Sequence, residues 1–157
     1  MSFSDDLDQE RASVIRAVRD ASAGWAKAMR AHKLAPPDAG FAERLRGLAV
    51  AAAREQVTWD RAHAAGLLWK PVPGAESAKP PYELLPGTGR RGPEELWERF
   101  DAAVAELNRA ITGSSAVAVA HAFGALADVA AEVADAVARA DEDAARAADR
   151  VRRRGAA

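Results

Sequence analysis

A long apolar repeat near the C-terminus constrains the fold of this chain more than any other feature. Apolar residues recur there at alternating steps of four and three positions, at Val119, Phe123, Leu126, Ala130, Val133, Val137, Ala140, Ala144, Ala147 and Val151. This spacing places them on one face of an α-helix, as in the seam of a coiled coil. The repeat therefore predicts a coiled-coil-like helix that is capped at Ser114 or Ser115 and continues to the end of the chain.

Three other stretches show the same helical spacing. They cover about residues 5–33, Pro36 to Gly66, and Pro93 to Gly113. At 1.5 Å per residue the fourth helix, about 60 Å long, extends past its neighbours. We expect one all-α domain over residues 1–157, an antiparallel up-down-up-down four-helix bundle with a long Pro-rich segment between its second and third helices and an extended C-terminal helix.

The Pro-rich segment, residues 67–92, has no helical period, yet it is too apolar for a solvated linker. We expect it to cover the core. We predict that its apolar residues pack across one end of the bundle, near the start of the first helix and against Trp59 and Trp97. These apolar residues are Trp69, Tyr82, Leu84 and Leu85. Trp69 and Tyr82 are also candidates for binding a partner, because Pro-rich segments dock in extended or polyproline conformation.

One charged residue interrupts the apolar repeat of the second helix. This residue is Glu55, and a short turn near position 37 would place it opposite Arg19 of the first helix. An interhelical ion pair between Arg19 and Glu55 is the expected arrangement, worth roughly 0 to 1 kcal/mol if half-exposed. A buried Glu55 would instead be a candidate site.

Composition and motifs argue against catalysis. Cysteine is absent, the three histidines do not converge in the expected bundle, and no paired carboxylate motif is present, so we expect no catalytic residue, no metal and no cofactor. Arg90 and Arg91 lie in a Gly-rich turn before the third helix, where backbone amides and guanidinium groups could hold a phosphate or a partner carboxylate. The turn lacks the spaced Gly-Lys-Ser/Thr element of a phosphate-binding loop.

The predicted function is contact with another protein, as an adaptor, regulator or self-assembling structural protein. Residues 139–157 form a helix overhang with a basic tail, and the overhang seam of Ala140, Ala144, Ala147 and Val151 would admit a partner helix or a second copy. Two alternatives are a nucleic-acid-associated regulator that uses the Arg tail, and a small-molecule-binding bundle with a pocket beneath residues 67–92. A net charge of −1 makes nucleic acid the less expected partner.

The expected location is the cytoplasm. The acidic first residues lack the basic and apolar regions of a signal peptide, and the longest nearly uncharged stretch, residues 114–127, is too short to cross a bilayer. The heavy use of Ala and Arg suggests a bacterial source with a GC-rich genome.

Overall fold

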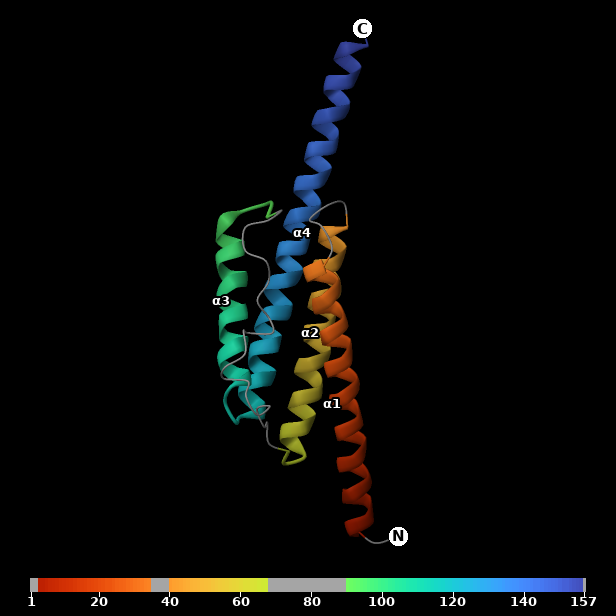
Figure 1. The fold of residues 1–157 in the computed structure, drawn as a ribbon, viewed down its shortest axis with the longest axis vertical. Helices are drawn as coiled ribbons and strands as arrows, with labels where there is room; N and C mark the ends of the chain where they lie inside the picture. Colours follow the sequence, from red (N-terminus) through yellow and green to blue (C-terminus); the bar gives the residue numbers. More distant parts are fainter. Residues whose placement is uncertain (1–2, 35–39, 68–89, 157) are drawn as a thin grey trace.

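The computed structural model describes residues 3–34, 40–67 and 90–156, and these form four helices and no strand (Figure 1). The helices are α1 (Phe3–Leu34), α2 (Phe41–Ala64), α3 (Glu94–Ile111) and α4 (Ala116–Gly155). The predicted all-α fold is confirmed for this part of the chain. The Pro-rich segment lies almost wholly outside it, so the covering role of Trp69, Tyr82, Leu84 and Leu85 stays a prediction.

Local sequence signals explain where two of the helices begin or end. Ser115 is the N-cap of α4, as predicted, and its hydroxyl accepts a hydrogen bond from the Ala118 amide at 3.2 Å. At the end of α2, Gly66 adopts a φ of 76° and donates to the His63 carbonyl at 3.0 Å. The next amide, that of Leu67, bonds back to the helix and completes a Schellman motif.

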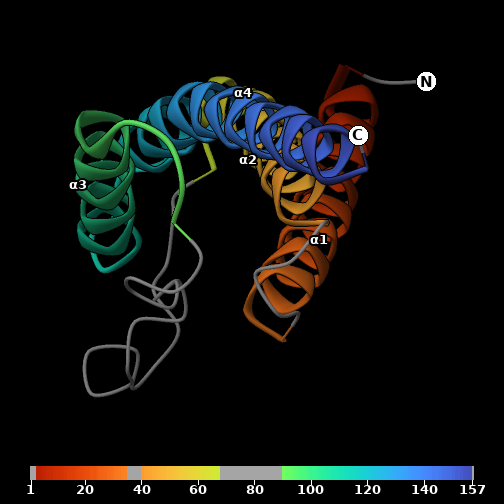
Figure 2. The same ribbon diagram turned by 90° about the horizontal axis from the view of Figure 1, so that it is seen from above.

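The helices form a curved row in the order α1, α2, α4, α3 (Figure 2). The most extensive contact joins α2 to α4, and the backbone of α1 comes close to α2 alone among the described helices. The predicted apolar faces of α2 and α4 meet at the centre of this row. Its two outer members, α1 and α3, are therefore each held mainly by one neighbour.

The predicted up-down-up-down order is wrong. In Figure 1, α1 and α4 run upward while α2 and α3 both run downward. Phe41, the first residue of α2, stacks on Trp97 near the start of α3 with ring centroids 6.0 Å apart, so the two helices begin at the same end. The prediction assumed that each helix begins where the preceding one stops. The connection from α2 to α3 is long enough to return along the 24 residues of α2, about 36 Å.

The predicted seams account for the core. The apolar face of α2 is buried at Phe41, Leu45, Leu48, Ala52, Trp59 and Ala62, together with Glu55. Helix α4 is buried along its predicted seam as far as Val137. Trp25 of α1 packs edge to face on Phe123 of α4, with the ring centroids 5.1 Å apart. This side-chain contact joins α1 to α4 although the two backbones do not come close. Ile15, an apolar residue of α1 next to the core residue Val14, is 40% exposed, because the backbone of α1 packs against one neighbouring helix rather than two.

Gly92, before α3, is a position where a side chain is not tolerated. Its φ is 96°, and an added Cβ would lie 3.2 Å from the Cβ of Ala136 on α4. We expect Gly92→Ala to lower the free energy of unfolding by roughly 1 to 3 kcal/mol. The backbone at this position is in the left-handed region, and Ala136 leaves little room for a methyl group.

The matched control is Gly47→Ala. Gly47 lies in the middle of α2 with no atom within 4 Å of an added Cβ, so the same change should raise the free energy of unfolding by about 0.5 to 1 kcal/mol. Chemical denaturation of both variants measures the difference. If both substitutions changed the free energy of unfolding in the same direction, this explanation of Gly92 would be contradicted.

Candidate functional site

Glu55 is a buried acid in the centre of the helix row. Its side chain is 2% exposed, and its Oε2 accepts a hydrogen bond from Trp59 Nε1 at 2.8 Å, one turn along α2. Burial raises the pKa of Glu55 from 4.5 to about 7, against the smaller lowering effect of hydrogen bonds from Trp59 and from Ser22 of α1. The carboxyl group is therefore about half protonated near neutral pH, unlike an ordinary glutamate.

The predicted ion pair between Arg19 and Glu55 is not what the structure shows. Arg19 is exposed, and the α1 side chain that reaches Glu55 is Ser22, almost one helical turn further along. The expected register of α1 against α2 was thus displaced by three residues. Two partners of Glu55 were missed, and only Trp59 had a sequence signal, its spacing of four residues on the same apolar seam.

Arg90 and Arg91 already bind carboxylates of the same chain. Arg90 forms a bidentate pair with Asp101, at 2.7 and 2.8 Å, and its guanidinium lies 4.8 Å from the ring centroid of Trp97. Arg91 is 2.7 Å from Asp141 of α4. These bonds fasten the start of α3 to itself and to α4, so an external anion would have to compete with internal carboxylates for both arginines.

The described tryptophans do not gather at one end of the bundle. Trp97 stacks on Phe41, whereas Trp59 lies 18 positions further along α2, about 27 Å away. The expected grouping of Trp59 and Trp97 at one end of the bundle is therefore wrong, because the grouping depended on the up-down-up-down order. Trp69 and Tyr82, the other predicted members, lie outside the described residues.

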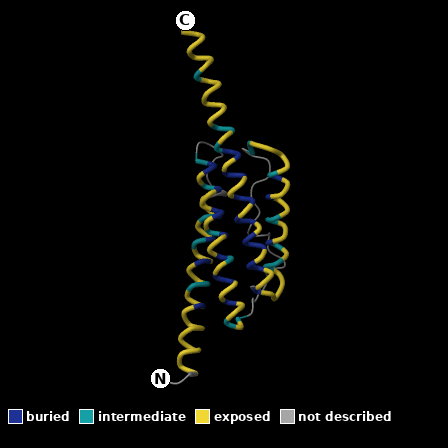
Figure 3. Tube along the Cα trace, turned by 180° about the vertical axis from the view of Figure 1, so that it is seen from behind, coloured by how far each residue is buried: buried dark blue, intermediate teal, exposed yellow. Residues whose placement is uncertain are grey.

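The end of α4 extends beyond the bundle as a single helix (Figures 1 and 3). We call residues 140–156 the α4 overhang. Val137 is the last buried residue of α4, and the predicted seam then becomes exposed, from the half-buried Ala140 through Ala144 and Ala147 to Val151, which is 70% exposed. The last three of the four predicted contact residues, Ala144, Ala147 and Val151, thus lie on an exposed face of the overhang.

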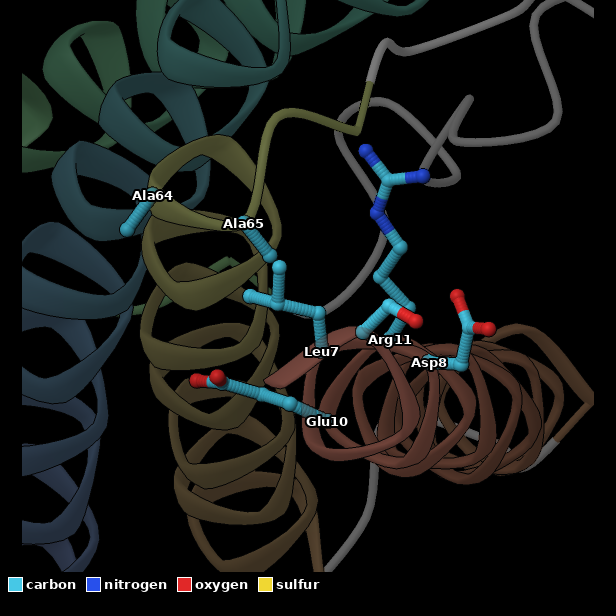
Figure 4. Close-up of a pocket in the computed structure, with 7 residues that line it drawn as sticks. Leu7, Asp8, Glu10, Arg11, Ala64 and Ala65 are labelled. Carbon is cyan, nitrogen blue, oxygen red and sulfur yellow. The ribbon is translucent and has the colours of Figure 1, made fainter. Parts of the chain in front are cut away.

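The start of α1 extends beyond the bundle at the opposite end (Figure 3). Residues 4–13 are all exposed, and Leu7 is 47% exposed. A cavity of about 360 Å³ lies between this stretch and the end of α2, lined by Ser4, Leu7, Asp8, Glu10, Arg11, Ala64 and Ala65 (Figure 4). This cavity was not predicted from the sequence, although Leu7 lies seven residues before the core residue Val14 and therefore on the same face of the helix.

No metal-binding group is present in the described ranges, where no three His, Cys, Asp or Glu side chains are placed to hold an ion. One described helix, α4, is long and apolar enough to cross a membrane, but 61% of its most apolar window is buried inside the bundle. That burial is typical of a core helix, and length and composition alone are weak evidence for a membrane span.

Comparison with known proteins gives this chain no relative from which a role could be transferred. It matches no family model, no curated protein and no solved structure.

Proposed function

We propose that this protein is a non-catalytic helical bundle that acts through protein–protein contacts made by the α4 overhang. The observation that carries the proposal is the continuation of α4 beyond the bundle, from Ala140 to Gly155, a distance of about 23 Å (Figure 1).

A single helix of this length is only marginally stable in water, because its intrahelical hydrogen bonds barely offset the conformational entropy that is lost when the chain is ordered. The overhang also exposes Ala144, Ala147 and Val151 on one face. A second helix packed on that face would bury it, and the small side chains would allow a close approach. A second copy of the chain, or a helix of another protein, meets this requirement.

The two alternative functions have less support. Asp149 lies 3.0 Å from Arg153 and 4.0 Å from Arg152, so part of the positive charge needed to hold a nucleic-acid backbone is already balanced. A small-molecule pocket beneath residues 67–92 that is lined by both Trp59 and Trp97 does not fit the structure, because these two residues lie far apart. Contact with another protein chain is therefore the function that we propose.

Removal of the overhang tests the proposal. A chain that ends at Asp143 keeps the Arg91–Asp141 pair and loses the exposed seam. We expect the intact chain to exceed the 16.6 kDa monomer mass as its concentration rises, and the shortened chain to stay monomeric. Its free energy of unfolding should fall by less than about 1 kcal/mol, since the deleted residues are exposed. Sedimentation equilibrium measures the masses.

A point substitution supplies the matched control. Ala147→Glu places a charge on the exposed seam, whereas Ala145→Glu makes the same change on the opposite side of the same exposed helix. The first should reduce association and the second should not. Monomeric mass for the intact chain at every concentration, or equal effects of the two substitutions, would contradict self-contact through the overhang.

A further inference from the structure

Two helix ends extend beyond the bundle, and they point in opposite directions along the molecule (Figures 1 and 3). We call residues 4–11 of α1, together with Ala64 and Ala65 of α2, the acidic end. We call residues 150–154 of α4 the basic end. Because α1 and α4 run in the same direction, the start of α1 and the end of α4 lie at opposite ends of the long axis. A contact between the two ends must therefore join different molecules.

The two ends carry opposite charges. The acidic end holds four carboxylates, those of Asp5, Asp6, Asp8 and Glu10, against the single guanidinium of Arg11. The basic end holds four arginines within five residues, at 150, 152, 153 and 154. Asp149 pairs with two of them, and within the described residues Arg150 and Arg154 form no ion pair. The overall charge is near neutral, so this polarity is a local property of the two helix ends.

The acidic end is also hollowed. Its cavity of about 360 Å³ has apolar walls from Leu7 and the two alanines at the end of α2. Figure 4 shows Leu7 directed toward Ala65, with Asp8 and Glu10 on either side of it. An apolar side chain flanked by cations fits such a surface. The basic end presents that arrangement, with Val151 exposed between Arg150 and Arg152.

We propose that the basic end of one copy binds the acidic end of a second copy, so that the protein assembles head to tail. This inference rests on the proposed function, since the contact is made by the α4 overhang. The two helices would lie side by side and parallel, with Val151 next to Leu7 and arginines beside carboxylates. Each copy keeps one end free, so the contact is heterologous and generates open chains rather than closed dimers.

Charge reversal tests the proposal on the full-length chain. The acidic-end variant is D6K/D8K/E10K, the basic-end variant is R150E/R152E/R154E, and the matched control for the first is E94K/E95K/E98K, which reverses three exposed carboxylates at the start of α3. We expect each end variant alone to be monomeric at low salt, and the control to associate as the unaltered chain does. High salt should dissociate the unaltered assembly, because exposed charges are then screened.

An equimolar mixture of the two end variants is the decisive sample. The glutamates of one then meet the lysines of the other, and the remaining natural ends still match, so the mixture should recover the mass of the unaltered assembly. Circular dichroism first establishes that each variant is folded, and recovery in the mixture confirms it.

The failure of this proposal is distinguishable from failure of the proposed function. Suppose that D6K/D8K/E10K associates like the unaltered protein while the chain ending at Asp143 stays monomeric. The overhang is then still the contact surface, but it pairs with the overhang of a second copy. That result overturns the head-to-tail arrangement. A mixture that stays monomeric, or an unaltered chain that is monomeric throughout, also overturns it.

Discussion

Replacing Glu55 with Gln should raise the free energy of unfolding by roughly 3 kcal/mol above pH 7 and leave it nearly unchanged below pH 4.5. The reason is the raised pKa of about 7 for this buried carboxyl, against 4.5 when it is exposed. Each pKa unit corresponds to about 1.4 kcal/mol of stability. The amide keeps an oxygen acceptor for Trp59 Nε1 and carries no charge at any pH.

The direction of the effect follows from proton linkage. Between pH 4.5 and about 7 the folded chain keeps the Glu55 proton while the unfolded chain releases it. The free energy of unfolding therefore falls as pH rises through this window, and the contribution of the proton is fully present only below it. Denaturant unfolding across this range should show the slope in the natural protein and a flatter profile in the variant.

The control for Glu55→Gln is Glu98→Gln, the same change at an exposed position on α3. It should leave the pH profile unchanged within about 0.5 kcal/mol. A Glu55→Gln profile that parallels that of the natural protein would mean that Glu55 is ionised in the fold, contrary to our account of its burial.

Trp25→Ala should lower the free energy of unfolding by about 3 to 5 kcal/mol, the usual cost of deleting a buried aromatic side chain. Trp25 is 2% exposed and forms the ring contact between α1 and Phe123 of α4. Since the backbone of α1 comes close to α2 alone among the described helices, loss of this ring should weaken the attachment of α1 more than that of α3.

Two measurements check the Trp25 prediction. Denaturant unfolding gives the size of the loss, and amide hydrogen exchange shows whether α1 loses protection before α3. Ile15→Ala is the control, because Ile15 is an apolar residue of the same helix that is 40% exposed, and its loss should cost less than about 1 kcal/mol. Equal losses for Trp25 and Ile15 would contradict the placement of Trp25 in the core.

The seams of the helices could be predicted from sequence because helical period and burial are linked by local geometry. This link identified the buried face of α2, including Glu55 as its one charged member. The order and direction of the helices could not be predicted, because the connection between α2 and α3 is long enough to begin α3 at either end. The grouping of Trp59 with Trp97 failed for the same reason.

The side-chain partners between helices also could not be predicted from the sequence. A register change of three residues between α1 and α2 placed Ser22, rather than Arg19, against Glu55. Arg90 finds its carboxylate 11 residues away and Arg91 finds Asp141 on another helix, 50 residues away. Such pairs depend on tertiary distances that local patterns do not encode. The exposed seam of the α4 overhang, in contrast, followed directly from helix lengths.

The central claim is that the α4 overhang is a surface for contact between copies of this protein. Amide hydrogen exchange of the intact chain at low and at high protein concentration tests it most directly. We predict that residues 140–156 exchange fast in dilute solution, as an isolated helix does, and gain protection as concentration rises, with residues 4–13 gaining protection in parallel and α3 unchanged. Fast exchange of the overhang at every concentration would contradict the claim.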